Sequence, residues 1–265
     1  MLRMFGKILI MFFVLTAMAS STKAQLVEDG LISYWSFDED TIEGEIVKDL
    51  WGNNHGTMVN NPEAVKGKYG QALEFSGANH VDVPDSESLD IATGEVSVTV
   101  WVNISGPSPT ERGGIVEKGN GGITNTPLLL REWTGGTVDF EVRNADTDPK
   151  WPKLQSDSVV PAGQWTFLAG TYDGKEEKIY INSTLDVSME YVDGFGTNDE
   201  LLRIGWDPYA EERHFYGIID EICVYNRALT PNEIQRNQDA ALGLAIEPAG
   251  KLSSAWGEIK AQKTR

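Results

Sequence analysis

The sequence feature that most constrains the fold is a strict alternation of side-chain type over residues 96–102. Valine occupies every second position there, and serine, threonine and tryptophan fill the positions between. A period of two predicts a β-strand in which all the valines point to one face. Because β-branched and aromatic residues suit a pleated, half-buried surface, we expect this strand to pack its valine face against a core.

Similar short patterns recur along the chain between residues 31 and 226, and Gly- and Pro-rich turns separate them. No helical periodicity occurs in this region except a single turn at residues 86–89. Many short strands without alternating helices predict an all-β fold, a two-sheet sandwich or a barrel, and argue against an α/β fold. The other strands predicted before residue 215 span residues 31–37, 72–75, 80–83, 114–117, 127–131, 137–143, 164–172, 178–182 and 201–204.

The stretch 215–234 predicts the end of the domain, a last strand followed by a short C-terminal helix. A period of two places Asp220 on the same face as Ile222 and Val224, which we expect to be buried. A buried carboxylate needs a metal ion, an arginine or backbone N–H groups as partner. Residues 230–233, Thr-Pro-Asn-Glu, form a capping box with proline at the first helical position, which predicts where the helix begins.

The first 24 residues have the pattern of a secretory signal peptide. Arg3 and Lys7 precede an apolar run at residues 8–19, and small or polar residues follow as far as Ala24. The apolar run is short for a membrane span, although an uncleaved N-terminal anchor is the alternative. We therefore predict that residues 1–24 are a signal peptide and that the protein is secreted, to the periplasm or the outside of the cell.

The predicted mature protein is one strongly acidic domain over residues 26–240. The whole chain has a formal net charge of −18, and the leader carries only positive charges. Such a surface should repel nucleic acid and anionic membranes, so we expect no nucleic-acid partner and no stable membrane insertion after signal cleavage. Cys223 is the only cysteine, which excludes an internal disulfide. Residues 245–265 are locally basic and aperiodic, and they predict a flexible C-terminal tail.

Nine segments carry motifs that are weak singly and specific as an ordered set. They are GLISYWSFDED (30–40), GNNHGT (52–57), KYGQALEFSGANHVDVP (68–84), VSVTVWV (96–102), GIVEKG (114–119), GQWTFLAGTYDG (163–174), KIYIN (178–182), LRIG (202–205) and GIIDEICVYNRALTPNEI (217–234). In this order the chain resembles the LamG-like jelly-roll family of the concanavalin A-like lectin/glucanase superfamily. The resemblance implies a sandwich of two antiparallel sheets in which the first and last strands are paired.

The resemblance also implies a structural calcium ion near the first and last strands. Carried onto this chain, Asp38, Asn79 and Asp220 would supply side-chain oxygens, and the turn at Ser76 would supply a backbone oxygen. The family usually has aspartate where Asn79 stands, and an amide ligand adds no charge, so calcium affinity should be reduced. The alternative is that Asp38 is an ordinary loop residue and that Asp220 accepts backbone N–H bonds.

Four aromatic residues in predicted turns and loops are candidates for a ligand-binding surface: Trp133, Trp151, Trp206 and Tyr209. Tryptophan and tyrosine rings suit the apolar faces of sugar rings, and loops often carry the functional residues of β-sandwiches. The alternative is that these rings only pack locally. If they bind, carbohydrate or a glycosylated protein is the expected partner.

The sequence assigns no catalytic residues. Asp139 and Glu141 alternate on the predicted strand 137–143, as paired carboxylates of glycoside hydrolases of this fold do. Arg143 shares their predicted face, which favours a surface salt bridge. The three histidines lie in separate segments without metal-ligand spacing.

We therefore expect a secreted jelly-roll binding or adhesion module for carbohydrate or a glycosylated partner, stabilised by calcium. Two alternatives remain open from the residues alone. One is a polysaccharide hydrolase or lyase that uses carboxylates without a recognisable motif. The other is a structural envelope or matrix protein that has no small ligand, because this fold serves all three classes of protein.

Overall fold

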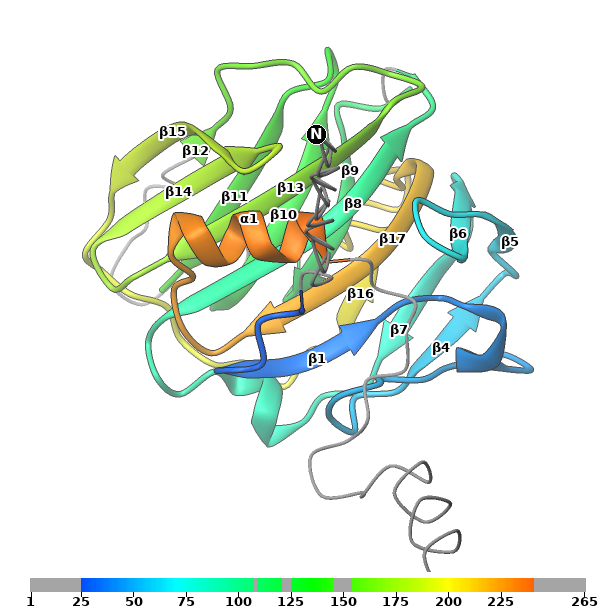
Figure 1. The fold of residues 1–265 in the computed structure, drawn as a ribbon, viewed down its shortest axis with the longest axis horizontal. Coiled ribbons are helices and arrows are strands. Elements are labelled where there is room, and N and C mark those ends of the chain that lie inside the picture. Colours follow the sequence, from blue (N-terminus) through cyan, green and yellow to red (C-terminus); the bar gives the residue numbers. More distant parts are fainter. Residues whose placement is uncertain (1–24, 107–108, 121–124, 145–153, 241–265) are drawn as a thin grey trace, which may run out of the picture.

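Two antiparallel sheets packed face to face make up the fold, and one α-helix follows the last strand (Figure 1). The jelly-roll sandwich predicted from the sequence is therefore confirmed. The computed structural model describes residues 25–106, 109–120, 125–144 and 154–240. Three predictions fall outside this described part of the chain: the signal peptide (1–24), the C-terminal tail (245–265) and the ligand-binding role of Trp151.

The eight-stranded sheet is built around the last strand, β17, which pairs with β8 along one edge. Its other edge is shared by β6 and β1, so the predicted pairing of the first and last strands is confirmed. In spatial order the strands are β15 (Thr184–Glu190), β14 (Glu176–Ile181), β13 (Trp165–Tyr172), β8 (Val96–Ile104), β17 (Tyr216–Tyr225), β6 (Gln71–Ser76) and β5 (Glu63–Lys66), with β1 (Leu31–Trp35) beside β17.

The nine-stranded sheet forms the opposite layer, and short 3-10 turns lie in two of the connections, η1 (Glu39–Thr41) and η2 (Glu87–Asp90). The turn predicted at residues 86–89 corresponds to η2. In spatial order the strands are β12 (Leu154–Gln155), β11 (Val138–Arg143), β10 (Thr126–Trp133), β9 (Arg112–Lys118), β16 (Leu202–Ile204), β7 (His80–Val83), β4 (Gly56–Val59), β3 (Ile46–Val47) and β2 (Ile42–Glu43).

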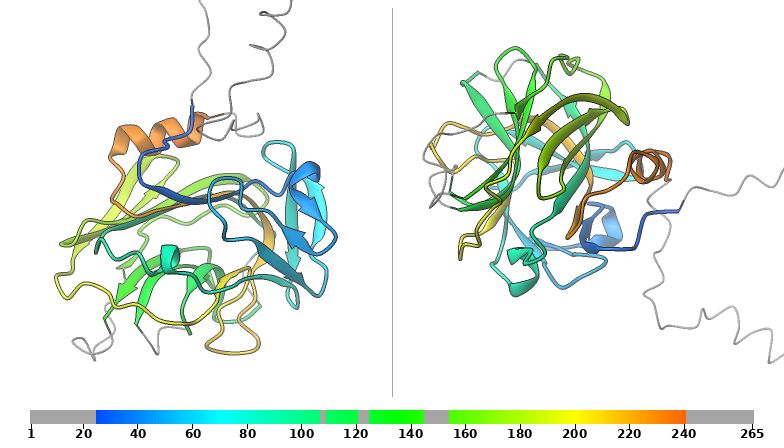
Figure 2. Two further views of the ribbon diagram at one scale, coloured as in Figure 1. Left: turned by 90° about the horizontal axis from the view of Figure 1, so that it is seen from below. Right: turned by 90° about the vertical axis from the view of Figure 1, so that its left-hand side faces the viewer.

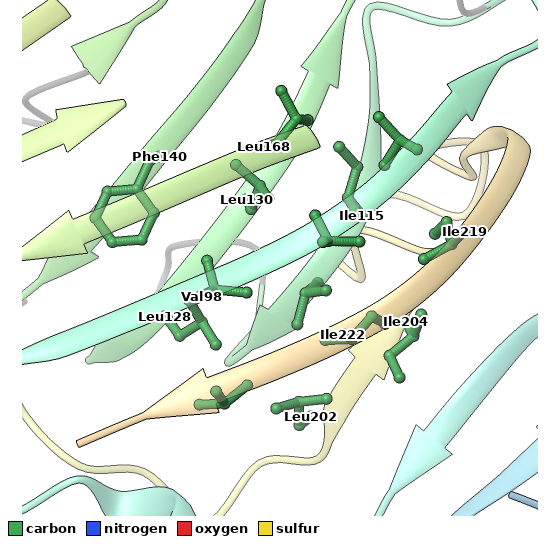
Figure 3. Packing of buried hydrophobic residues seen from close by; sticks show 14 of the residues in the cluster. Val98, Ile115, Leu128, Leu130, Phe140, Leu168, Leu202, Ile204, Ile219 and Ile222 are labelled. Carbon is green, nitrogen blue, oxygen red and sulfur yellow. The ribbon is translucent and has the colours of Figure 1, made fainter. Parts of the chain in front are cut away.

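The main hydrophobic core lies between the two sheets (Figure 3). The alternating valines of β8 are fully buried there, as the sequence predicts. Val98 and Leu168 of one sheet meet Leu128 and Leu130 of the other. Full burial of such a side chain contributes about 1.5–3 kcal/mol relative to exposure, so this layer supplies most of the driving force for folding.

A second apolar cluster covers the outer face of the eight-stranded sheet. Helix α1 (Pro231–Asp239) lies across this face (Figure 2). Leu26 and Val27 belong to the same apolar cluster as Ile234 of the helix. The predicted capping box is confirmed, because Thr230 and Glu233 bond each other's backbone N–H groups. Within the described residues, no helix is long and apolar enough to cross a membrane.

A β-bulge at Glu221 interrupts β17, so the prediction of one continuous period-two face is wrong. Glu221 has a φ of 56°, and the pairing with β8 shifts between Asp220 and Cys223. Ile219 and Ile222 both face the core as a result. Asp220 lies instead on the outer face, on the same side as Cys223, because an extra residue in one strand reverses the alternation.

Candidate functional site

An ionic cluster centred on Arg131 lies on the outer face of the nine-stranded sheet. The Arg131 guanidinium is fully buried, and it binds Asp139 through two bonds, Nη2 to Oδ2 at 2.6 Å and Nε to Oδ1 at 3.2 Å. Its Nη2 also donates to Oε1 of Glu141 at 3.0 Å, and its Nη1 lies 3.5 Å from Oδ2 of Asp207. These four residues are called the Arg131 cluster below.

Strand alternation and register bring the cluster together. Asp139 and Glu141 alternate on β11, and Arg131 on β10 lies directly opposite Asp139 in the antiparallel pair. The intervening Phe140 points into the core. The prediction of a surface salt bridge with Arg143 is wrong, because the two acids are buried and their partner comes from the neighbouring strand.

Burial opposes the charge on Arg131, but the carboxylates of Asp139 and Glu141 outweigh it and raise the pKa of the guanidinium. A buried charge is tolerated only when it is paired and hydrogen-bonded, and this cation has three carboxylate neighbours. Both oxygens of Asp139 are engaged by the guanidinium. The cluster therefore has the arrangement of a rigid support, and Asp139 is not placed as a free acid or base.

Asp207 comes from a loop that crosses the glycines of β9. A Cβ atom added at Gly114 would lie 2.3 Å from the carbonyl carbon of Trp206, so only glycine allows this close approach. A bridge between Trp206 and His214 closes the loop. The loop thereby holds Trp206 and Tyr209 against the sheet, beside the Arg131 cluster.

Tyr209 and Trp133 are each stacked against an arginine. The Arg213 guanidinium lies 4.2 Å from the centre of the Tyr209 ring, and the Arg112 guanidinium lies 4.2 Å from the centre of a Trp133 ring. Oε2 of Glu111 lies 3.4 Å from both arginines. Tyr209 is 44% exposed, so its ring is accessible from solvent. Such stacks fix the orientation of an aromatic ring before a ligand arrives.

Trp206 belongs to a group of three aromatic rings on the same face. Its ring stacks on His214 with centres 5.5 Å apart and planes inclined by 14°, and the ring centre of His80 lies 4.8 Å away. Its indole N–H donates to the carbonyl of Ala210 at 3.3 Å. Burial and the neighbouring His80 both lower the pKa of His214, which favours the uncharged imidazole at neutral pH.

The structure thus brings three of the four predicted aromatic residues, Trp133, Trp206 and Tyr209, to one face around the Arg131 cluster. Sequence reasoning missed Arg131 and Asp207, which link them. The alternation of Asp139 and Glu141 was the one available signal, but it does not reveal which cation lies opposite on the next strand. The binding role of these aromatic residues stays a prediction.

Two of the predicted calcium ligands face one loop at residues 67–71. Oδ2 of Asp220 accepts the N–H groups of Lys68 at 2.8 Å and Tyr69 at 3.2 Å, and Oδ1 of Asp38 accepts that of Gln71 at 3.0 Å. Oδ1 of Asp220 is buried and has no hydrogen-bond partner in the described part of the chain. Burial first, and then the charge of Asp38, raise the pKa of Asp220 to about 8, although backbone hydrogen bonds oppose the shift.

The other two predicted ligands, Ser76 and Asn79, lie elsewhere. Oδ1 of Asn79 accepts the N–H of Ser76 at 2.9 Å, and Ser76 is paired with Tyr216. Tyr216 precedes Asp220 by four residues on β17, which is about 13 Å along a strand. The structure therefore does not bring these two residues to the Asp38 and Asp220 loop.

Sequence reasoning also missed Glu221, the bulge residue beside Asp220. Its Oε2 accepts the hydroxyl of Tyr34 at 2.6 Å, while its buried Oε1 has no hydrogen-bond partner among the described residues. Burial and the charge of Asp220 raise its pKa well above the usual range.

No group of three His, Cys, Asp or Glu residues that could hold a metal occurs within residues 25–106, 109–120, 125–144 and 154–240. A cation here would need backbone oxygens or water to complete its shell.

Sequence comparison relates the chain to part of much longer proteins. Over 114 residues it is 31% identical to the human (Homo sapiens) adhesion G-protein coupled receptor D1, a match that spans 42% of this chain and 13% of the receptor. The Bos taurus receptor D1 is 29% identical over 113 residues, which is 41% of this chain and 12% of the receptor.

Structural comparison finds the same fold in several solved proteins. Domain 4 of AbnA, an extracellular GH43 arabinanase from Geobacillus stearothermophilus solved with arabinotriose, has a TM-score of 0.59 at 22% identity, covering 78% of this chain and 98% of that domain. The binding domain of botulinum neurotoxin DC in complex with SialylT has a TM-score of 0.63 at 15% identity, covering 81% and 52%. Trypanosoma rangeli sialidase with the inhibitor DANA has a TM-score of 0.60 at 15% identity, covering 82% and 35%.

The family assignment rests on the sequence itself. The pattern of the family described as the concanavalin A-like lectin/glucanases superfamily matches residues 75–235, which run from the end of β6 into α1. That span includes the strands that carry the Arg131 cluster and the bulged strand β17. The chain belongs to the concanavalin A-like lectin/glucanases superfamily.

Proposed function

We propose that the protein is an exported binding module that recognises carbohydrate, free or on a glycosylated partner, on the outer face of its nine-stranded sheet. The observation that carries the proposal is the gathering of Trp133, Trp206 and Tyr209 around the buried Arg131 cluster. Aromatic rings supply flat apolar area for sugar rings, and neighbouring arginines supply donors for sugar hydroxyls. Solved proteins of the same fold contain arabinotriose or SialylT, which supports this ligand class.

Rigidity of the surface favours binding. Arg112 and Arg213 fix the Trp133 and Tyr209 rings, and the Arg131 cluster ties the loop that carries Tyr209 to β10 and β11. A ligand that meets side chains already in place loses less conformational entropy on binding. This arrangement favours a binding role over hydrolysis, because the alternating carboxylates of β11, Asp139 and Glu141, are both engaged by Arg131.

A structural calcium ion is the second part of the proposal. Asp38 and Asp220 fit it, because both carboxylates face the loop at residues 67–71 and Asp220 keeps one buried oxygen without a hydrogen bond. Glu221 adds a second such oxygen on the neighbouring residue. Calcium accepts carboxylate and backbone oxygens in flexible geometry, so carbonyl groups of the loop could complete the shell. Ser76 and Asn79 do not fit, because they are bonded to each other at the far end of β6.

Export is the third part of the proposal, and it rests on the sequence of residues 1–24. Basic residues, a short apolar run and a small-residue end are the three parts of a secretory signal. N-terminal sequencing of the protein recovered from the culture medium or periplasm should begin at or near Gln25. Recovery of full-length protein from the cytoplasm alone would contradict export.

The test of the binding surface is a glycan array followed by calorimetric titration of the best glycan. Separate Trp133→Ala, Trp206→Ala and Tyr209→Ala variants should each weaken binding roughly tenfold, which corresponds to about 1.4 kcal/mol. Thermal unfolding of the same samples separates lost contacts from lost structure. Trp165→Phe is the matched control, since Trp165 packs against the outer face of the other sheet. Unchanged affinity in all three variants, with wild-type melting, would place the binding site elsewhere.

A further inference from the structure

A hollow at one end of the sandwich has the features of a built binding site and shares no residue with the aromatic surface proposed above. It has a volume of about 690 Å³, opens to solvent, and is lined by the start of β1, the turn η2 and the residue that follows β17. Its volume is within the usual range of small-ligand pockets. Its lining includes Leu31, Trp51, Ser88, Ile91 and Asn226.

Trp51 forms one wall of the hollow, and a buried carboxylate fixes its position. Asp49 accepts the backbone N–H of Tyr34 at 2.9 Å and those of Trp51, Gly52 and Asn54 at 3.0 Å each. Four such bonds to one side chain hold the loop in a single conformation. The Trp51 ring packs partly against the second apolar cluster and also lines the hollow. The backbone of Trp51 is therefore fixed, and its partly buried side chain lines the hollow.

A network of small polar side chains fixes another part of the lining, at Ser88. The buried amide of Asn54 donates to the hydroxyls of Ser33 at 2.7 Å and Ser88 at 3.0 Å, and it accepts from Ser86 at 2.7 Å. Ser88 is exposed and lines the hollow. Its hydroxyl lies 3.2 Å from Oδ1 of Asn54 and 2.9 Å from the Ser86 hydroxyl, so its proton is used within the network and a lone pair is left to accept a hydrogen bond from a ligand.

The floor contains an unusual backbone conformation. Ile91 has φ 49° and ψ 54°, the left-handed region that β-branched residues rarely adopt. Its side chain is buried in the main core, which compensates for the strain. The left-handed turn directs the following residues, Ala92 and Thr93, along the rim of the hollow. Strain of this kind is retained where the surrounding structure requires it, commonly at ligand clamps.

The lining chemistry selects an uncharged, hydroxyl-rich ligand. The described lining residues supply amides, hydroxyls and an exposed carboxylate, Glu87, but no lysine, arginine or histidine. An anion would meet only repulsion there, in a chain that is already strongly acidic. The side-chain amide of Asn226 makes no hydrogen bond to any described residue, so it remains available to a ligand. An aromatic ring and polar amide and hydroxyl groups in one lining match the apolar face and the hydroxyl edge of a sugar ring.

We infer that this hollow is a second saccharide subsite, in which an uncharged sugar ring stacks on Trp51 and is hydrogen-bonded by Ser88 and Asn226. The ligand class rests on the proposed function, but the site does not depend on Trp133, Trp206 or Tyr209. A module with two separate subsites could hold two chains of a polysaccharide or two points of one chain. Two linked contacts bind more tightly than either alone.

The test uses saturation-transfer NMR and tryptophan fluorescence with four uncharged probes: xylotriose, arabinotriose, mannotriose and cellotriose. Trigalacturonic acid and the glucosamine trimer serve as charged comparators. At least one uncharged probe should bind, and Trp51→Ala should weaken that binding at least tenfold. Asn226→Ala should weaken it severalfold without changing the melting temperature, which keeps the test valid if Trp51→Ala does not fold. The matched control is the triple variant Trp133→Ala/Trp206→Ala/Tyr209→Ala, which should retain this binding.

Each outcome bears on one or both of the two sites. If the triple variant loses all binding of uncharged probes and Trp51→Ala loses none, the inference is wrong and the proposed function stands. If Trp51→Ala and Asn226→Ala weaken the binding of an uncharged probe while the triple variant retains it, the inference stands, and the proposed surface is judged separately by the titration of its three single variants. A preference for either charged trimer at Trp51, or no binding of an uncharged probe even at millimolar concentration, overturns the inference.

Discussion

The two outer faces of the sandwich bury carboxylates in opposite ways. On the nine-stranded sheet, Asp139, Glu141 and Asp207 surround a guanidinium, and Arg131 bonds or approaches all three. On the eight-stranded sheet, Asp220 and Glu221 are equally buried, yet neither has an ion pair within the described residues, and each keeps one oxygen without a hydrogen bond. The carboxylates of the first group have a cation from the protein itself, whereas those of the second need a proton or a bound cation.

This difference shows that the surroundings of a buried acid, and not its burial, decide its chemistry. A carboxylate that is bonded to a fixed guanidinium has its hydrogen-bonding needs met within the protein and acts as structure. A carboxylate that has only backbone donors and a like charge beside it holds its proton more tightly, as the raised pKa of Asp220 shows. The first face is therefore suited to supporting a rigid surface. The second is suited to binding a positive ion that ties β1, β6 and β17 together.

The largest effect on the free energy of unfolding should follow from removing the cation of the Arg131 cluster. Arg131→Met removes the guanidinium that Asp139, Glu141 and Asp207 share, although Asp207 keeps a second arginine nearby, Arg213 at 3.4 Å. Removing one member of a buried ion pair costs about 3–5 kcal/mol, because the remaining charge stays desolvated. Urea unfolding at neutral pH should show a loss of this size in the free energy of unfolding.

The matched control is Lys178→Met, which deletes the cation of an exposed group. Lys178 also has two carboxylate partners, Asp173 at 3.2 Å and Glu176 at 2.8 Å, but all three side chains are partly open to solvent. Exposed ion pairs contribute about 0–1 kcal/mol. Equal losses in the two variants would show that the Arg131 cluster is not the desolvated network described here.

The next largest effect concerns the buried carboxylates of the eight-stranded sheet and the calcium ion proposed there. A cation held at Asp38 and Asp220 binds only the folded chain, because these residues are distant in sequence and meet at one loop. At 100 times its dissociation constant, free calcium would stabilise the fold by about 2.7 kcal/mol. The melting temperature should therefore fall in chelator and recover in calcium, and Asp220→Asn should remove most of this response.

Asn79→Asp tests whether calcium binds at the site predicted from the sequence, which includes Asn79, or at Asp38 and Asp220 without it. If Asn79 were a ligand, an added carboxylate charge would strengthen the response to calcium. The structure places Asn79 at the far end of β6, so we expect the response to be unchanged. Identical melting of the wild type in chelator and in millimolar calcium would refute the calcium site altogether.

Most of the fold could be predicted from the sequence, because the alternation of apolar and polar residues matches the alternation of core-facing and outward-facing positions. The alternation in 96–102 corresponds to β8, and Thr230 with Glu233 marks the start of α1. The strands that sequence reasoning missed, β2 to β5, β12 and β15, are short or lie at the edge of a sheet. The strands of two to four residues are too short to show a period, whereas β15 does alternate, with Leu185, Val187 and Met189 between polar residues, and this signal was overlooked.

The sites were less predictable, because they depend on register and on one bulge. The acids Asp139 and Glu141 were visible as an alternating pair, but Arg131 lies on another strand and only the β10–β11 register makes it their partner. Asp220 was recognised as a buried acid. The left-handed conformation of Glu221 was not, since glutamate gives no local signal for it. That single residue moves Asp220 to the outer face.

A smaller, pH-dependent effect concerns Glu177, an acid that connects the two sheets. Glu177 on β14 is fully buried, and its Oε1 accepts the N–H of Val142 on β11 at 2.7 Å. Burial first, and then the charges of Glu141 and Asp139, raise its pKa from 4.5 to about 8, against the effect of the Val142 bond. The uncharged carboxyl therefore predominates in the folded protein at neutral pH.

The direction of the pH dependence follows from the difference in proton binding between the folded and unfolded states. Between pH 4.5 and about 8 the folded state keeps a proton that the unfolded state releases. Glu177 thus stabilises the fold fully below pH 4.5, and this contribution is lost as the pH rises toward 8. From pH 6 to pH 7 the loss is at most about 1.4 kcal/mol. Glu177→Gln should flatten the dependence measured by urea unfolding, whereas Glu176→Gln, on the same strand but partly exposed, should leave it unchanged.

The smallest effect should come from the helix that closes the eight-stranded face. The Thr230 hydroxyl accepts the N–H of Glu233 at 3.4 Å, and Glu233 returns a bond to the N–H of Thr230 at 2.8 Å. The bidentate pair with Arg227 is the main cause that lowers the pKa of Glu233 to about 2, so the cap stays charged at any ordinary pH. Thr230→Ala should cost about 1 kcal/mol, the usual value of an N-cap.

This loss should be local, because α1 covers only the outer apolar cluster and the main core lies beneath the sheet. Hydrogen exchange should therefore accelerate in α1 and in the residues that it covers, such as Tyr225, while β10 and β11 keep their protection. Thr184→Ala, which deletes an exposed hydroxyl on β15, is the control and should change neither region. If exchange accelerates equally on both sheets, the two sheets unfold as one unit. The difference between their outer faces would then have no effect on their local stability.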